Sequence, residues 1–170
     1  MYGMGPKRLA ETIEVSYSEA RDIMDKFFAV YPKIKQYLDS LVNNAKRNSY
    51  AISPLDNRKR WLVDFDWDVP KEAAHAGNIA RNMPFQGGNA SITKLALIFL
   101  RNKILENDWD IDNKARIINT IHDEILTEVH KSLADQMKQI QIEEMLRAAY
   151  EFVKNVPMAV DCTVSDHWVK

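Results

Sequence analysis

Three adjacent ionisable residues, His122, Asp123 and Glu124, stand between two stretches that have the pattern of β-strands. Residues 116–121 and 125–129 are rich in β-branched side chains, and apolar residues alternate there with polar ones. We therefore predict a β-hairpin connected by the polar triplet, although the triplet contains none of the usual turn residues Gly, Asn and Pro. A carboxylate at a rigid hairpin tip is a candidate metal ligand. Three polar residues in a turn are, however, more commonly a solvated loop.

A second acidic cluster, Asp64, Asp66 and Asp68, has the spacing that opens a calcium-binding loop. Such a loop requires glycine at its sixth position and glutamate at its twelfth, and this chain has Val69 and His75 there. We therefore interpret this cluster as a solvated loop rather than a calcium site.

The composition is that of one globular domain, with 170 residues, 46% of them hydrophobic and 28% charged. The single Cys162 excludes an internal disulfide and a cysteine-based metal site. A formal net charge of −1 argues against a basic nucleic-acid coat, which leaves residues 46–47 and 58–60 as local basic clusters. Because neither a signal peptide nor an apolar run of membrane-spanning length is present, we expect a cytoplasmic protein with no membrane partner.

Helices and a second hairpin are expected around these motifs. Ser16 and Glu19 have the spacing of a capping box, which predicts a helix over residues 17–30. Pro32 can open the next helix. The other expected elements are a helix to about residue 47, a hairpin of residues 50–52 and 61–63 around a turn at 54–57, helices near 71–80, 86–107 and 133–154, and a strand at 158–164. This order of elements predicts an α+β fold.

Three separated motifs resemble the polymerase region of family A DNA polymerases, the class of bacterial DNA polymerase I. In chain order they are YGMG at residues 2–5, NMPFQG at residues 82–87 with Lys94 following, and IHDE at residues 121–124. The stretch FFAVYP and the DHW near the end of the chain also resemble that family, so the likeness extends over essentially the whole sequence.

This resemblance implies an α+β fold with a palm-type antiparallel sheet, in which hairpins pack against several helices and the polymerase fold is incomplete. It assigns residues 1–50 to the end of the fingers and the helices that follow. It assigns residues 51–170 to the palm portion, which carries the His-Asp-Glu hairpin.

The implied activity is that of a DNA-directed DNA polymerase, which transfers nucleotides to a DNA primer by a two-metal mechanism. One Mg²⁺ ion activates the attacking oxygen and the other steadies the leaving phosphates, and carboxylates hold both ions. By resemblance Asp123 is a catalytic residue and metal ligand, Glu124 is an auxiliary catalytic carboxylate, and His122 contacts the primer end. The expected partners are therefore a DNA primer–template, deoxynucleoside triphosphates and Mg²⁺.

The second motif has a physical rationale of its own. The side-chain amides of Asn82 and Gln86 can donate hydrogen bonds to purine N3 and pyrimidine O2, which every correct base pair presents in the minor groove. These residues would therefore inspect the primer–template duplex, with Arg81 as a further DNA contact. The resemblance also places Tyr2 and Gly3 at the template and nucleotide site.

The chain departs from the family pattern at several positions. Asn78 stands where many members carry an Arg, and Arg81 lies one helical turn away as a candidate substitute. Gly88 and Ser91 occupy positions that are often Thr and Asp.

The family residues that grip the triphosphate, and its other metal-binding Asp, lie upstream of Tyr2. We therefore expect a C-terminal polymerase portion that is inactive without an upstream polymerase fragment as its partner. The alternative is a noncatalytic DNA-binding remnant of such a polymerase. A metal-dependent nuclease is a third reading, for which residues 64–68 would have to supply a second carboxylate cluster.

Overall fold

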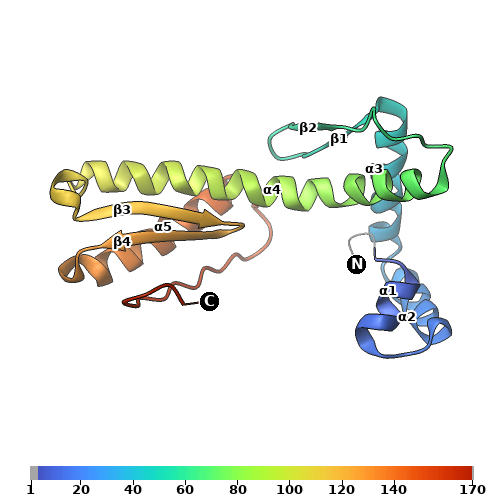
Figure 1. Cartoon of the computed structure of the whole chain (residues 1–170), viewed down its shortest axis with the longest axis horizontal. Coiled ribbons are helices and arrows are strands. Elements are labelled where there is room, and N and C mark those ends of the chain that lie inside the picture. Colours follow the sequence, from blue (N-terminus) through green and yellow to red (C-terminus); the bar gives the residue numbers. More distant parts are fainter. Residues whose placement is uncertain (1–3, 170) are drawn as a thin grey trace. The chain divides into compact units, whose positions relative to one another are not determined.

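The computed structural model describes residues 4–169 as an α+β chain (Figure 1). The α-helices of this part are α1 (Pro6–Ile13), α2 (Tyr17–Val30), α3 (Pro32–Asn48), α4 (Pro70–Glu106) and α5 (Ala134–Phe152). The strands form two antiparallel pairs, β1 (Tyr50–Ile52) with β2 (Lys59–Trp61) and β3 (Ala115–Ile121) with β4 (Glu124–Val129). Two 3₁₀ turns, η1 (Ile111–Asn113) and η2 (Lys131–Leu133), flank the second pair. The expected α+β class, with hairpins packed against helices, is confirmed.

The chain folds as two compact units, the first ending at Gly87 and the second beginning at Gly88. The expected assignment of residues 1–50 to the fingers side and 51–170 to the palm follows family parts rather than compactness, and it stays a prediction. Along residues 4–169, no helix is both long and apolar enough to cross a membrane.

The first unit begins with α1, which was not predicted from the sequence, and continues with two helices that were predicted. The Ser16 hydroxyl accepts a hydrogen bond from the Glu19 backbone N–H (3.2 Å), and the Glu19 carboxylate accepts one from the Ser16 N–H (3.0 Å). This reciprocal pair is the predicted capping box, and α2 spans the predicted residues. Pro32 opens α3. The core of the unit joins α3, β1 and α4 through small side chains and one large one: Ala45, Ala51, Leu62, Ala76 and Ala80.

A single helix, α4, replaces the two helices expected over residues 71–80 and 86–107. Pro84 lies inside it and removes one backbone hydrogen bond, because proline has no N–H. The expected break at the Pro-Gly segment was therefore wrong, because α4 continues through it. Pro84 is buried, and Gly87 in the next turn packs tightly against Ser53. These tertiary contacts outweigh the poor local helix propensity.

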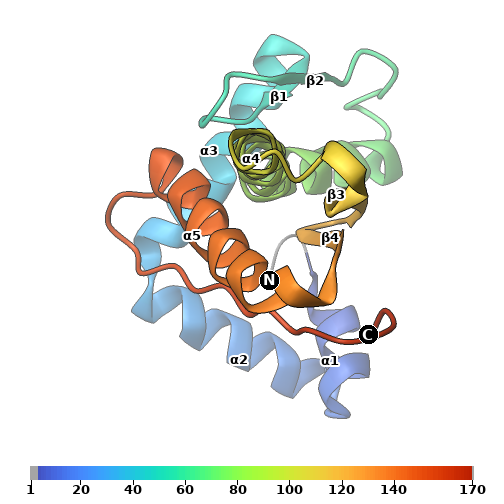
Figure 2. The ribbon, with the colours of Figure 1, turned by 90° about the vertical axis from the view of Figure 1, so that its left-hand side faces the viewer.

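The second unit packs α5 and the β3–β4 hairpin against the later turns of α4, as Figures 1 and 2 both show. Its core draws on every one of these elements: Ala96, Leu100 and Ile104 of α4, Trp109, Ala115 of β3, Ile125 of β4, and Met137 and Ala148 of α5. The hairpin therefore rests on a buried apolar layer formed by two helices.

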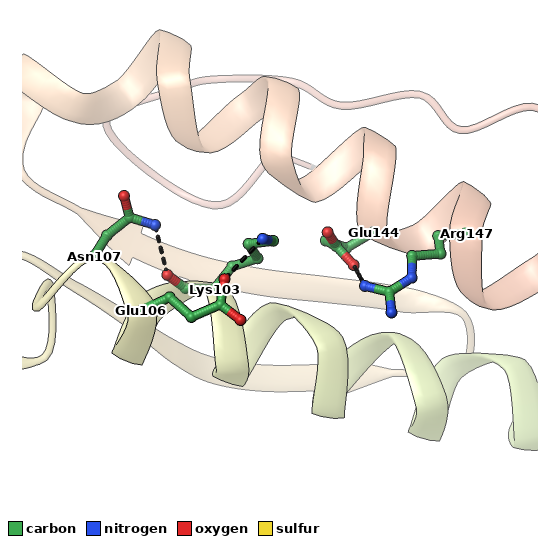
Figure 3. A network of polar contacts seen from close by, with 5 residues as sticks. All are labelled: Lys103, Glu106, Asn107, Glu144 and Arg147. Carbon is green, nitrogen blue, oxygen red and sulfur yellow. Dashed lines mark hydrogen bonds and ion pairs between the residues drawn. The ribbon is translucent and has the colours of Figure 1, made fainter.

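Figure 3 shows polar contacts of this unit, around Lys103 near the end of α4 and between Glu144 and Arg147 of α5. Lys103 pairs with Glu106 (2.7 Å), and the pKa of Lys103 is raised by that hydrogen bond and charge, with a smaller contribution from Glu144. Glu144 is buried on α5 and pairs with Arg147 (3.0 Å), whose guanidinium lies over the Phe99 ring of α4 at 4.0 Å. Arg147 therefore neutralises a buried carboxylate and also contacts the neighbouring helix.

Residues 158–164 form no strand, contrary to the sequence prediction. Their burial does alternate, because Met158, Val160 and Cys162 are half-buried and the residues between them are exposed. A strand also requires a hydrogen-bonded neighbour, however, and the described sheets consist only of the β1–β2 and β3–β4 pairs. Burial of the Cys162 thiol raises its pKa.

Candidate functional site

The tip of the β3–β4 hairpin carries the predicted carboxylates. Ile121 pairs with Glu124, so the loop contains only His122 and Asp123, and Glu124 is the first residue of β4. The hairpin is confirmed, whereas the expected three-residue connection is corrected to two. His122 has φ 56°, in the left-handed region that a two-residue hairpin loop requires. Histidine is among the non-glycine residues that tolerate this region best, which explains a tight turn without glycine.

Helix α5 holds the β3–β4 hairpin through hydrogen bonds to β4. Gln141 is buried, and its side-chain amide donates to the Ile125 carbonyl at 2.8 Å. The Gln141 carbonyl oxygen accepts a hydrogen bond from the Thr127 hydroxyl, also at 2.8 Å. On the exposed side of the hairpin, Arg116 pairs with Glu128 across the strands at 3.0 Å. The strands that carry the tip are therefore held by backbone pairing with each other and by side-chain contacts from α5 and across the hairpin.

A pocket of about 360 Å³ opens beside the tip, entirely within the second unit. Asp123 and Glu124 line it together with Asp161 of the C-terminal segment and Asn89 of α4. Its remaining lining is largely apolar: Ile92, Thr93, Ala96, Ile125, Gln141, Met145, Ala149, Met158, Ala159 and Val160. The exposed carboxylates thus stand at the edge of an apolar hollow.

Glu124 has a partner that the sequence did not predict. The indole N–H of Trp168 donates to Glu124 Oε1 at 3.0 Å, across 44 positions of sequence. The DHW motif pointed to this segment, but nothing in its spacing indicated which residue it contacts. Asp161 and Asn89 were also missed as neighbours of Asp123, because no local pattern links them to the hairpin.

Asp123 is the metal ligand that the sequence predicts. It is exposed at the loop, and carboxylate oxygen is the donor that Mg²⁺ prefers. Among residues 4–169, no group of three or more His, Cys, Asp or Glu side chains could hold a metal ion together. Mg²⁺ commonly keeps several of its waters and binds through one or two carboxylates, so Asp123 fits as a single ligand. The exposed cluster of Asp64, Asp66 and Asp68 agrees with the solvated-loop interpretation.

The remaining predicted site residues belong to the first unit or lie outside the described part. Arg81 and Asn82 are half-buried on α4, and Gln86 is exposed on the same helix. Asn82 and Gln86 are four residues apart and so share one face of the helix. Tyr2 and Gly3 lie outside the described residues.

Comparison with known proteins gives a consistent result over the full sequence. The model of DNA polymerase family A matches residues 1–170. DNA polymerase I of Caldicellulosiruptor bescii is 36% identical over 168 residues, which are 99% of this chain and 19% of that protein. DNA polymerase I of Geobacillus stearothermophilus is 30% identical over 168 residues, 99% of this chain and 18% of that protein. The chain therefore spans about a fifth of the length of these relatives.

A solved structure gives the same result for the fold. The POL domain of Pol1 from M. smegmatis, in complex with DNA primer-template and dNTP, superposes with a TM-score of 0.75 and 29% sequence identity. The match covers 86% of this chain and 25% of that one. With the family model matching from the first residue to the last, this chain belongs to DNA polymerase family A.

Proposed function

We propose that this chain contributes part of the active site for template-directed addition of deoxynucleotides to a DNA primer. The observation that carries the proposal is the hairpin, which presents the Asp123 carboxylate in a two-residue loop between paired strands. A site on such a scaffold loses little freedom when it binds a ligand. The chain corresponds to 19% of its relative from C. bescii, so the activity is proposed for the polymerase of which this region forms a part.

In this proposal Asp123 holds Mg²⁺, Glu124 is an auxiliary carboxylate and His122 contacts the primer end. Bound Mg²⁺ would supply Lewis-acid stabilisation of the charge that develops during phosphoryl transfer. The hydrogen bond from Trp168 supports the role of Glu124, because it restrains one oxygen of that carboxylate beside the tip. His122 lies at the loop position with φ 56°, so its exposed imidazole is held next to Asp123 by the backbone.

Contact with the duplex is proposed for the first unit. Gln86 and Asn82 would donate hydrogen bonds to minor-groove acceptors, which lie in the same place in all correct base pairs. Arg81 is the neighbouring DNA contact, and Tyr2 with Gly3 would adjoin the template and the incoming deoxynucleotide. DNA primer–template and deoxynucleoside triphosphates are thus the proposed partners, with an upstream polymerase region completing the site.

Metal binding can be tested on the 170-residue chain with Mn²⁺, which replaces Mg²⁺ at oxygen sites and broadens nearby NMR signals. We expect the amide signals of residues 122–124 to broaden first, and Asp123→Asn to abolish this effect. Glu128→Gln is the matched control, because Glu128 is an exposed carboxylate of the same hairpin that pairs with Arg116. Equal broadening at residues 122–124 in Asp123→Asn would contradict the assignment.

Activity can be tested in a chimera in which this chain replaces the 168-residue aligned part of the C. bescii polymerase. We expect template-dependent primer extension by the chimera, a loss of at least about a hundredfold in Asp123→Asn, and little change in Glu128→Gln. The 170-residue chain alone is predicted to give no extension. Extension by the chain alone would refute that expectation, whereas an inactive, folded chimera that still binds duplex would favour the noncatalytic DNA-binding alternative.

A further inference from the structure

The loop between β1 and β2 packs directly on α4 at Gly87. Ser53 is fully buried, and a Cβ atom added at Gly87 would lie 2.8 Å from the Ser53 Cβ and 3.1 Å from its hydroxyl oxygen. Real Cβ atoms essentially never approach another carbon so closely, so the loop and the helix touch here only because residue 87 has no side chain. The buried Ser53 hydroxyl has no hydrogen-bond partner within the described part of the chain, as expected where the loop and the helix pack too closely to admit another polar group.

Arg58 adds a hydrogen bond between the β1–β2 loop and Gly87. Its Nη2 donates to the Gly87 carbonyl at 2.9 Å, and its side chain is 39% exposed. Asp56 holds the arginine from the other side, because its carboxylate pairs with Arg58 Nε and also accepts the Arg58 backbone N–H at 3.2 Å. The Ser53 N–H donates to the Arg58 carbonyl at 2.9 Å and closes the loop. Asp56 and the loop hydrogen bond therefore hold the guanidinium in the orientation in which it contacts α4.

The turn of α4 that receives this contact has little intrinsic helical stability. Pro84 removes a backbone hydrogen bond, and glycine at residues 87 and 88 is about 1 kcal/mol per residue less favourable in a helix than alanine. Gln86, exposed and adjacent to Gly87, lies in that turn. The hydrogen bond from Arg58 to the Gly87 carbonyl therefore restrains a turn of α4 that has little stability of its own. That carbonyl lies one residue from Gln86, a proposed DNA contact.

We propose that Arg58 is a positioning residue, which holds the turn of α4 so that Gln86 meets the minor groove of the primer–template duplex in a fixed orientation. This inference rests on the proposed function and adds a determinant of mispair discrimination to it. Arg58 acts here through Gly87 and not as a phosphate contact, which distinguishes it from the exposed Lys59 and Arg60 beside it.

The test compares the 170-residue chain with its Arg58→Ala, Arg58→Lys and Arg60→Ala variants. Arg60→Ala is the control that is matched in charge, since it removes one positive charge from the same hairpin without touching Gly87. Each protein is titrated with duplexes whose primer terminus is matched or mispaired, and the Gln86 side-chain amide signals and the two dissociation constants are recorded. Amide hydrogen exchange of residues 85–91 without DNA, compared with residues 71–80, reports the restraint itself.

We expect the wild-type chain to prefer the matched duplex by roughly threefold to tenfold, the worth of one or two hydrogen bonds. Arg58→Ala should reduce this ratio to near one and speed amide exchange over residues 85–91 alone. Arg58→Lys should fall between, because lysine can reach the carbonyl but lacks the planar fork that Asp56 holds. Arg60→Ala should weaken both duplexes and keep the ratio.

Two results would overturn the inference in distinguishable ways. If the wild-type chain shows no preference and no shift of the Gln86 signals, the proposed minor-groove contact itself fails. If the wild type discriminates and Arg58→Ala discriminates equally well, the proposed function survives and the positioning role of Arg58 is refuted. Circular dichroism of Arg58→Lys identifies any general loss of folding, and a folded variant with the wild-type ratio and exchange pattern also counts against the inference.

Discussion

Two glycines of α4, Gly77 and Gly87, should respond to the same substitution with opposite signs. In the interior of a helix, Gly→Ala gains about 1 kcal/mol of stability from helix propensity alone. At Gly77 a new Cβ would meet Arg81 Nη1 at 3.4 Å and the Val42 methyls at 3.6 and 3.8 Å, which are ordinary contacts, one of them with a flexible side-chain end. Gly77→Ala should therefore raise the free energy of unfolding by about 0.5–1 kcal/mol.

At Gly87 the gain in propensity is outweighed. The new Cβ would lie 2.8 Å from the Ser53 Cβ, about 0.7 Å inside the roughly 3.5 Å at which two carbons pack without repulsion. The Ser53 Cβ cannot rotate away, so the loop itself must move. Overpacking of this kind costs about 1–3 kcal/mol, and a strained Arg58–Gly87 hydrogen bond costs about 1 kcal/mol more. We expect Gly87→Ala to lower the free energy of unfolding by about 2 kcal/mol.

The assay is urea denaturation of the wild type and both variants. Because the chain has two compact units, hydrogen exchange over residues 50–62 should show that the change arises in the first one. A Ser53→Gly/Gly87→Ala double variant removes the clashing Cβ and should be more stable than the two single changes predict together. If Gly87→Ala were as stable as Gly77→Ala, the Ser53 Cβ would not oppose a side chain at residue 87. The close contact between the loop and α4 would then no longer support the role proposed for Arg58.

Three further predictions concern groups outside this contact. Gln141→Leu should lower the free energy of unfolding by about 1–3 kcal/mol, since it leaves the Ile125 carbonyl and the Thr127 hydroxyl without their partner; urea denaturation measures it. The Ser16 hydrogen bonds lower the pKa of Glu19 below its ordinary 4.5, so their stabilisation is present above that pH and is lost as pH falls through the lowered value. Ser16→Ala should return the Glu19 pKa to its ordinary range in an NMR titration. Because burial raises the Cys162 pKa, its thiol should react with iodoacetamide at pH 7 more slowly than glutathione does.

Elements governed by neighbouring residues could be predicted from the sequence. The capping box of α2 is a hydrogen-bond exchange between Ser16 and Glu19, three positions apart, so its spacing is visible in the chain. The β3–β4 hairpin follows from the alternation of residues on both sides of the tip. In both cases the physical cause lies within a few residues of the pattern that reports it.

Features governed by distant contacts could not be predicted in the same way. The continuity of α4 through Pro84 depends on packing with the 53–58 loop, which no helix signal in residues 70–106 encodes. The expected strand at 158–164 has the right alternation, but alternation does not specify a pairing neighbour. At the candidate site Asp123 and Glu124 were predicted from the sequence, whereas the hydrogen bond from Trp168 to Glu124 and the place of Asp161 in the same pocket arise only from the fold.

The hydrogen bond between Trp168 and Glu124 has a practical consequence for studying the hairpin. Indole emission depends on the polarity and charge around the ring, so this tryptophan is a natural optical reporter situated beside the proposed metal ligand. The chain contains four tryptophans, and a difference spectrum between the wild type and Trp168→Phe isolates its contribution. Ion or primer binding at the tip could then be followed in real time with an unlabelled protein, through the light emitted by one of its own side chains.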